Sequence, residues 1–85
     1  MRSRRTKQFH KLFARLPLHV QQEAIKAYQL FRNDPYHPSL HFKQIDPRDP
    51  IYSVRIGRNY RAVGWYEDGV IRWYWIGSHE DYNKL

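Results

Sequence analysis

The residues of this chain best suited to chemistry are arginines, aromatic residues and a histidine near the C-terminus. Five of them lie in one segment: Arg55, Arg61, Trp65, Arg72 and Tyr74. A guanidinium presents a planar pair of donors that fits a phosphate, and aromatic rings stack on bases. His79 follows this segment, and an imidazole can give or take a proton near neutral pH. These residue types predict a nucleic-acid site with a proton-transfer group beside it.

Each of these residues also fits a purely structural role. Arg61 and Arg72 can be solvated side chains on the open face of a sheet, and Trp65 and Tyr74 can be ordinary cross-strand packing. His79 can be a surface residue of a capping turn. The reason to favour a site is that register arguments, which make no use of function, place these groups on one face.

Other catalytic patterns are absent from the sequence. There is no Gly-rich phosphate loop, no pair of carboxylates at a credible site and no recognisable arrangement of serine, histidine and aspartate. The lack of cysteine excludes a thiolate nucleophile, a disulfide scaffold and a zinc site built on sulfur. His37 and His41 are separated by Pro38 and have no carboxylate set nearby. We therefore predict no metal site and no cofactor.

The charge of the chain points to a polyanion or an acidic protein as partner. Lys and Arg number 15 against 8 Asp and Glu, a formal charge of +7. Residues 1–33 carry this excess, with Glu23 as their single acidic residue, while the charges of residues 34–85 cancel. Nucleic acid is the favoured partner. A solvated, soluble helix face is the alternative explanation.

The length of 85 residues fits one domain, residues 1–85, with a single core. A multidomain enzyme is excluded. The start MRSRRTK is similar to the basic region of a signal peptide, but charged residues and histidine interrupt the segment that follows. Because no long apolar run occurs either, we expect a soluble, cytoplasmic protein that makes no contact with a membrane.

Two amphipathic helices are predicted in the N-terminal part. Thr6 is a suitable cap for the first, whose apolar face follows helical spacing: Phe9, Leu12, Phe13 and Leu16. Pro17 suits the first turn of a new helix, which runs to about Asn33 with an inward stripe: Val20, Ala24, Ala27, Tyr28 and Phe31. Ile25 and Leu30 lie off this stripe, so they are expected to stay exposed. The two helices should form an antiparallel hairpin.

The second half of the chain predicts strands. Four prolines between positions 35 and 50 prevent a helix there. Residues 40–43 alternate and predict a short edge strand, which contains Lys43, a further candidate for a phosphate contact. From Ile51 the period becomes two over residues 51–56, 60–66 and 70–76, which predicts a three-stranded antiparallel meander.

A two-residue turn at Asp68–Gly69 sets the register of the last two strands. On one face it predicts these pairs: Trp65 with Arg72, Val63 with Tyr74 and Arg61 with Ile76. On the other face it predicts Gly64 with Trp73 and Ala62 with Trp75. Two indoles opposite two small residues compensate in volume, so this second face is expected in the core. A three-residue loop, GRN, would pair Arg55 with Arg61; a two-residue loop would send Arg55 into the core, which is disfavoured.

The tail SHEDYNKL predicts a short terminal helix. Ser78 and Asp81 have the spacing of a capping box, and His79 and Tyr82 then share one helix face. The predicted fold class is therefore α+β. A helical hairpin packs on a three- to four-stranded antiparallel sheet, and the short helix ends the chain near the rim of the sheet face that carries Arg61 and Arg72.

The order of these elements resembles the RelE/ParE superfamily of type II toxin–antitoxin toxins. The resemblance covers nearly the whole chain and is carried by PYHPSLHFKQI, by YSVRIGRNYRAVGW and by the ending WIGSHEDYNKL. It implies a toxin, and in the ribonuclease branch a ribosome-dependent endoribonuclease that cuts mRNA without a metal. It also implies a cognate antitoxin that is acidic and folds on binding.

By the same resemblance, Arg61 is the strand arginine that stabilises the phosphate, and Arg55 is a second phosphate contact. His79 and Tyr82 match the C-terminal acid and base pair. Lys43 lies where a substrate-binding or catalytic lysine often lies. With the register argument, Arg72, Trp65 and Tyr74 are assigned to substrate binding.

The chain also departs from the superfamily's pattern. Members with a histidine acid often carry a glutamate base before the meander, where this chain offers only Asp46, so the general base is unassigned. At most residues 1–5 remain for the usual first strand, so a full sheet edge is not expected. Two alternatives stay open: a ParE-like gyrase inhibitor, and a non-catalytic RNA- or protein-binding module with the same basic, aromatic face.

Overall fold

The N-terminal part of the chain folds as a strand and two helices whose boundaries follow local signals. The computed structural model describes residues 1–85. It begins with strand β1 at Arg2–Arg5, helix α1 at Lys7–Ala14 and helix α2 at Leu18–Asn33. Thr6 caps α1 by accepting a hydrogen bond from Phe9 N at 3.1 Å.

No helix in the structure has the length and apolar character needed to cross a membrane.

The remaining strands complete a five-stranded mixed sheet. They are β2 at Lys43–Gln44, β3 at Ile51–Ile56, β4 at Tyr60–Glu67 and β5 at Val70–Ser78. The order across the sheet is β1-β5-β4-β3-β2. The α+β class and the antiparallel meander are confirmed. The strand number is larger than predicted because β1 adds to the edge of β5, and this pair is parallel.

The segment between α2 and β3 differs in detail from its prediction. Instead of a strand over residues 40–43, a 3-10 turn at Pro38–Leu40 buries Leu40, and β2 begins only at Lys43. Between them His41 adopts the left-handed region with φ 46°. The alternation of four residues is too short a signal to separate a strand from a turn that is anchored by one apolar side chain.

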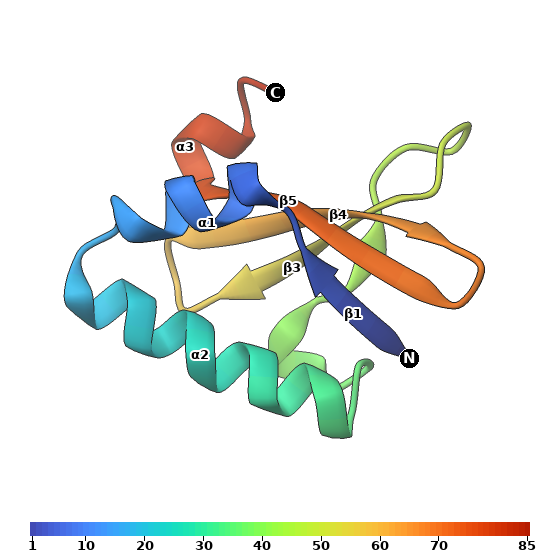
Figure 1. Ribbon diagram of the computed structural model, residues 1–85, viewed down its shortest axis with the longest axis horizontal. Helices are drawn as coiled ribbons and strands as arrows, with labels where there is room; N and C mark the ends of the chain where they lie inside the picture. The colour runs from blue at the N-terminus through green and yellow to red at the C-terminus, as the bar shows by residue number, and fades with distance from the viewer.

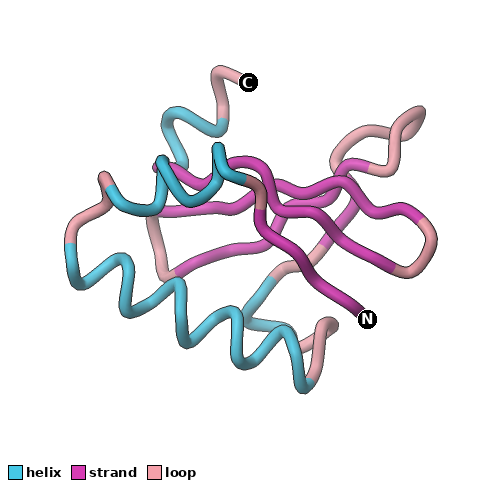
Figure 2. Tube along the Cα trace, viewed as in Figure 1, coloured by secondary structure: helices cyan, strands magenta, loops and turns pink.

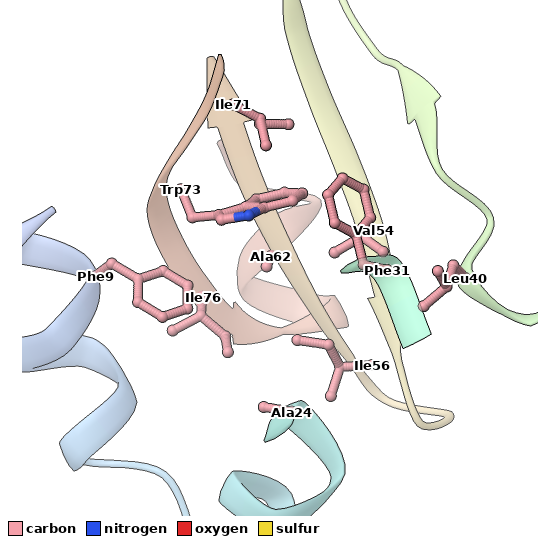
Figure 3. Close-up of a cluster of buried hydrophobic side chains, with 10 residues drawn as sticks. All are labelled: Phe9, Ala24, Phe31, Leu40, Val54, Ile56, Ala62, Ile71, Trp73 and Ile76. Carbon is pink, nitrogen blue, oxygen red and sulfur yellow. The ribbon is translucent and has the colours of Figure 1, made fainter. Parts of the chain in front are cut away.

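The helices and the sheet enclose one apolar core. Helix α2 runs along one side of the sheet, whereas the terminal helix α3, at His79–Tyr82, lies beyond the other side (Figure 1; the trace in Figure 2 gives the same arrangement). Figure 3 shows the side chains that form this core, which come from α1, α2, the 3-10 turn and the sheet: Phe9, Ala24, Phe31, Leu40, Val54, Ile56, Ala62, Ile71, Trp73 and Ile76. The opposite face of the sheet is the open face, and it lies on the side of α3.

The turn at Asp68–Gly69 fixes the first part of the β4–β5 register as predicted. Trp65 lies opposite Arg72, and Gly64 lies opposite Trp73. A Cβ atom on Gly64 would come within 2.8 Å of Trp73 Cε3, so the close approach of the indole to β4 needs glycine. Trp73 is 3% exposed, which confirms the prediction that it packs over Gly64 in the core.

Beyond this point a β-bulge overturns the predicted register. The next pair joins Val63 to Trp75, so Tyr74 is an extra residue without a partner on β4. The strand after the bulge is therefore shifted by one residue, and Trp75 lies on the open face while Ile76 enters the core. Three predicted pairs are wrong for this reason: Val63–Tyr74, Ala62–Trp75 and Arg61–Ile76.

One of the two apolar residues expected on the surface of α2 is not there. Ile25 is 51% exposed, as predicted. Leu30 instead packs in part against the core. The stripe of α2 that faces the core is therefore wider than the sequence spacing indicates.

Candidate functional site

The open face presents its side chains in rows that cross the strands. One row runs from Lys43 on β2 to Ser53 on β3. The next row pairs Arg61 with Arg55 on one side and with Gly77 on the other. We call the row of Arg55, Arg61 and Gly77 the arginine row. The pairing of Arg55 with Arg61 confirms the prediction of a three-residue loop between β3 and β4.

Arg61 is at the centre of the side-chain contacts on this face. Its Nη1 lies 3.5 Å from Ser53 Oγ, and its Nε lies 3.4 Å from His79 Nδ1. Its guanidinium carbon is 5.2 Å from the centre of the Tyr82 ring, within the range of a cation–π contact. The structure thus brings together the three residues to which the sequence assigned chemistry. These contacts orient the half-buried guanidinium without occupying all its donors.

The position of the two C-terminal residues follows from the capping of α3. Ser78 Oγ accepts from Asp81 N at 3.1 Å, as the capping-box spacing predicts. The backbone N of His79 donates to Asn59 O at 2.6 Å, which ties the start of α3 to the loop before β4. The His79 and Tyr82 rings then lie 5.9 Å apart between centres, nearly parallel at 20°. The short helix therefore holds both rings over Arg61.

The contact with Arg61 determines where neutral His79 carries its proton. An arginine Nε always bears a hydrogen, so it can only donate. His79 Nδ1 must then be the acceptor, and the proton of the neutral ring is on Nε2. The Nε2–H group is left free to donate to a ligand.

Neither arginine of the arginine row forms an ion pair with a carboxylate. The single ion pair in the structure joins Arg48 to Asp46 at 3.9 Å, outside this row. Two cross-strand arginines repel each other unless an anion lies between or above them. The chemistry of this arginine pair suits an anion with several acceptor oxygens, such as a phosphate.

Arg55 and Lys43 lie beside the central cluster and do not contact it. Arg55 Nε donates to Gly57 O at 2.9 Å, and Arg55 Nη1 lies 3.5 Å from His41 Nε2. Lys43 is exposed on the edge strand opposite Ser53. Arg55 is thus the direct cross-strand neighbour of Arg61, whereas Lys43 lies two strands away from β4 on the same face.

The other predicted binding residues share the sheet but lie farther away. Trp65 is four residues along β4 from Arg61, about 13 Å at the usual rise of a strand. Its indole N–H donates to Glu67 Oε2 at 2.9 Å, and Arg72 lies opposite it. Tyr74 is the bulge residue, and burial raises the pKa of its hydroxyl. None of these three side chains touches the Arg61 cluster.

Three residues that the sequence did not indicate help to build the cluster. Trp75 was assigned to the core, but its ring lies 6.4 Å from the Tyr82 ring between centres. A Cβ atom on Gly77 would come within 2.7 Å of Trp75 Cζ2, so glycine is needed for the indole to lie across β5. The bulge hid both roles, because it moves Trp75 to the open face. Ser53, fully buried beneath Arg61, was also missed.

Asp46 is the acidic residue nearest in sequence to the place of the expected glutamate base, but its carboxylate makes other contacts. Asp46 Oδ1 accepts from Arg48 N at 2.8 Å and from Asp49 N at 3.3 Å, so it caps its own loop. No group of three or more histidine and acidic residues is arranged to hold a metal ion. The chemistry available on the open face is therefore charge compensation by arginines and proton transfer by an imidazole or a phenol.

Comparison with known proteins identifies the family. The model of the ParE-like toxin domain matches residues 18–84, most of the chain. The chain belongs to the ParE-like toxin family. This confirms the resemblance to the RelE/ParE superfamily and makes the chain a toxin of the toxin–antitoxin type. No curated protein sequence matches it significantly.

Solved structures similar to this ParE-like toxin show the same fold. The RelB–RelE antitoxin–toxin complex from Methanococcus jannaschii has 18% identity and a TM-score of 0.76, with 95% of each chain covered. The RelBE2 complex from Mycobacterium tuberculosis has 16% identity and a TM-score of 0.72, with 92% of this chain and 96% of that chain covered. YafQ from E. coli has 12% identity and a TM-score of 0.69, covering 96% and 98%.

Proposed function

We propose that this ParE-like toxin is a metal-independent, ribosome-dependent endoribonuclease that cuts mRNA and thereby inhibits translation. The observation that carries the proposal is the environment of Arg61. It has a cationic neighbour, Arg55, and no carboxylate partner, and it contacts both His79 and Tyr82. A site of this composition favours a phosphate whose charge increases during a reaction. The proposed target implies a cytoplasmic location.

The proposed reaction is attack of a ribose 2′-oxygen on the adjacent phosphorus. The O2′–P bond forms, the P–O5′ bond breaks, and a cyclic phosphate and a 5′-hydroxyl result. Arg61 and Arg55 neutralise the charge of the pentavalent phosphate. This electrostatic stabilisation supplies the larger part of the rate enhancement. His79 through Nε2, or Tyr82 through its hydroxyl, protonates the departing O5′.

Cationic and aromatic residues outside the cluster of Arg61, His79 and Tyr82 bind the ribosome and mRNA. Lys43 and Arg72 are exposed on the open face and contact neighbouring phosphates, while Trp65 and Tyr74 offer rings to unpaired bases. The N-terminal cations are exposed on β1 and α1: Arg2, Arg4, Arg5, Lys7 and Lys11. They attract ribosomal RNA without taking part in bond breaking.

A cognate antitoxin is the second proposed partner. A groove of about 230 Å³ lies between α1 and α2 and includes Phe13, Ile25 and Tyr28. Arg5 and Arg32 lie over the Tyr28 ring, at 5.1 and 6.0 Å from its centre. An apolar groove with cationic rims suits an acidic amphipathic segment that folds on binding. The neighbours from M. jannaschii and M. tuberculosis are themselves antitoxin–toxin complexes.

The nuclease proposal is tested with purified toxin, programmed ribosomes and two mRNAs. One mRNA is all-ribose, and the other lacks the 2′-hydroxyl at the cut site. We expect cleavage of the first with a cyclic phosphate end, unchanged by a chelator, and no cleavage of the second. Cleavage of the 2′-deoxy substrate at the same bond would exclude the mechanism. Tight binding with no cleavage of either mRNA would favour a non-catalytic RNA-binding module.

Gyrase inhibition is the second candidate, because the family that matches is named for ParE. Its test is supercoiling by purified gyrase with and without the toxin. Inhibition at toxin concentrations that leave mRNA intact would replace the nuclease proposal. We expect supercoiling to continue under conditions in which mRNA is cut.

A further inference from the structure

The arginine row continues beyond Arg55 to a residue outside the strands. In the pairing of β2 with β3, Lys43 is opposite Ser53 and Gln44 is opposite Tyr52. Extended backwards by two residues, this register places His41 opposite Arg55. The side chains meet there, with Arg55 Nη1 3.5 Å from His41 Nε2. The row therefore has an imidazole at each end, His41 at the sheet edge and His79 on α3.

The two imidazoles face the arginines in the same way. An arginine nitrogen can only donate, so His41 Nε2 offers a lone pair toward Arg55, as His79 Nδ1 does toward Arg61. A neutral His41 in this tautomer carries its proton on Nδ1. The Nε2 electron pair thus faces Arg55 Nη1, at the end of the arginine row. When Arg55 donates to a phosphate instead, this pair becomes available to accept a proton beside that phosphate.

The backbone holds His41 in this orientation at an energetic cost. Its φ of 46° is in the left-handed region, which is unfavourable for a residue that carries a side chain. The turn is fixed on both sides, because Leu40 is buried and Phe42 packs against the core. An exposed side chain on a rigid, strained turn is better suited to positioning than to stability.

We propose that His41 is the general base of this toxin. The inference rests on the proposed ribonuclease function and fills the role that function leaves open. His41 Nε2 takes the proton of the 2′-hydroxyl, the O2′–P bond forms as P–O5′ breaks, and His79 or Tyr82 returns a proton to O5′. In-line displacement requires the base and the acid on opposite sides of the phosphorus. The arginine row separates His41 from His79 in this sense.

Acidic residues are less well placed for this role. Asp46 accepts two backbone N–H groups of its own loop. Glu23 reaches the start of the β3–β4 loop from α2, since a Cβ atom on Gly57 would collide with its carboxylate. It forms no ion pair with Arg55. An imidazole that already contacts the row is the acceptor that the structure offers.

The test compares His41→Gly with wild type in single-turnover cleavage of ribosome-bound mRNA. Glycine adopts a φ of 46° without strain, so this change should keep or raise the melting temperature while removing the imidazole. We expect cleavage to slow by about 100-fold or more at saturating toxin, with the Kd for the programmed ribosome changed less than threefold. His41→Asn, which also tolerates the left-handed region, should behave alike. The control His19→Gln removes an exposed histidine of α2 and should cleave as wild type does.

A second substrate separates the base from the acid. In an mRNA whose O5′ at the cut site is replaced by sulfur, the leaving thiolate needs no proton. This substrate should restore cleavage by the acid-deficient double variant His79→Gln and Tyr82→Phe, and should leave His41→Gly slow. Restoration in His41→Gly would make His41 the acid and overturn the proposal.

Three other results would also overturn it. Cleavage by His41→Gly within threefold of wild type, while Arg61→Ala is inactive, would remove His41 and leave the ribonuclease function standing. A loss of affinity with an unchanged maximal rate would make His41 a binding residue. Wild-type toxin that cuts no mRNA would remove the ribonuclease function and, with it, the assignment of His41.

Discussion

At the scale of single residues, Arg61 is the most informative position. It is half-buried on the open face, where its contacts are made with other site residues and with Ser53. Arg61→Ala should therefore leave the fold intact and remove about 2–4 kcal/mol of transition-state stabilisation, as for the loss of one oxyanion donor. The measurements are mRNA cleavage and growth arrest, together with a melting curve.

Arg72→Ala is the matched control for this change, since Arg72 shares the open face and lies opposite Trp65. It should weaken binding modestly and leave the rate at saturation unchanged. Full toxicity of a folded Arg61→Ala protein would contradict the assignment of this residue.

At the scale of the elements, the β4–β5 pair makes a prediction about packing in the core. Trp73 lies against Gly64, and any Cβ atom there would come within 2.9 Å of Ile71 Cγ1 as well. Gly64→Val should overpack the core and cost roughly 1–3 kcal/mol or more, measured by thermal or denaturant unfolding. Asp68→Asn, in the turn but outside the core and compatible with the φ of 53° at this position, serves as a control and should leave the melting temperature unchanged. An unchanged melting temperature for Gly64→Val would mean that Trp73 does not pack as described.

The bulge leads to a second prediction, which concerns Trp75 on the open face of β5. Gly77→Ala should push the Trp75 indole away from β5 and disturb the Tyr82 ring that it contacts. The rate of mRNA cleavage should fall by about tenfold with little loss of stability. A small displacement of the Tyr82 ring changes how the reacting groups are positioned but removes no core contact. Trp75→Phe in the same chain removes the colliding atoms and should restore part of the rate. Additive losses in the double variant would show that the two positions are not coupled.

These elements also show what the sequence predicts well and what it does not. The turn at Asp68–Gly69 has a strong local signal, so the pairs up to Gly64 and Trp73 follow from it. The bulge has no such signal in the sequence. One extra residue in β5 moves each later side chain of the strand to the other face of the sheet, and no residue type marks the position. Strand β1 was missed as a full edge because RSRR has no alternating apolar pattern, and its pairing is with β5, distant in sequence.

The placement of several candidate residues could also be predicted from local signals. Arg61 belongs to a strand whose face was deduced from neighbours, and its pairing with Arg55 follows from the length of one loop. His79 and Tyr82 reach it because a capping box begins directly after β5. His41 was not predictable, since its place depends on a turn and on a left-handed backbone that no local pattern indicates.

At the scale of the whole molecule, the uneven charge predicts how the toxin approaches its target. The exposed cations of β1 and α1 are distant in sequence from Arg61, His79 and Tyr82. Replacing Lys7 and Lys11 by glutamine should weaken association with the ribosome and reduce its dependence on salt, by a slope of about one for each phosphate that is no longer neutralised. The maximal cleavage rate should not change. Binding that stays equally salt-dependent would place the electrostatic contact on another surface.

The last prediction concerns the surface that the antitoxin covers. Ile25 is exposed beside Tyr28 in the groove between α1 and α2, whereas Leu30 packs in part against the core and is a poorer anchor. Ile25→Glu replaces an apolar contact by a negative charge facing an acidic partner, which disfavours binding in both respects. The isolated toxin should keep its melting temperature and its activity but resist neutralisation, with the Kd for the antitoxin raised at least tenfold.

The control for this change is Leu18→Glu, at the start of the same helix and 69% exposed. Leu18 is not among the residues of the groove, so neutralisation of this variant should be normal. Resistance of both variants would indicate a general effect of added charge. If neither variant resists, the antitoxin covers another surface. The arginine row is then the first to examine, because a carboxylate placed between Arg55 and Arg61 would supply the anion that these two residues lack.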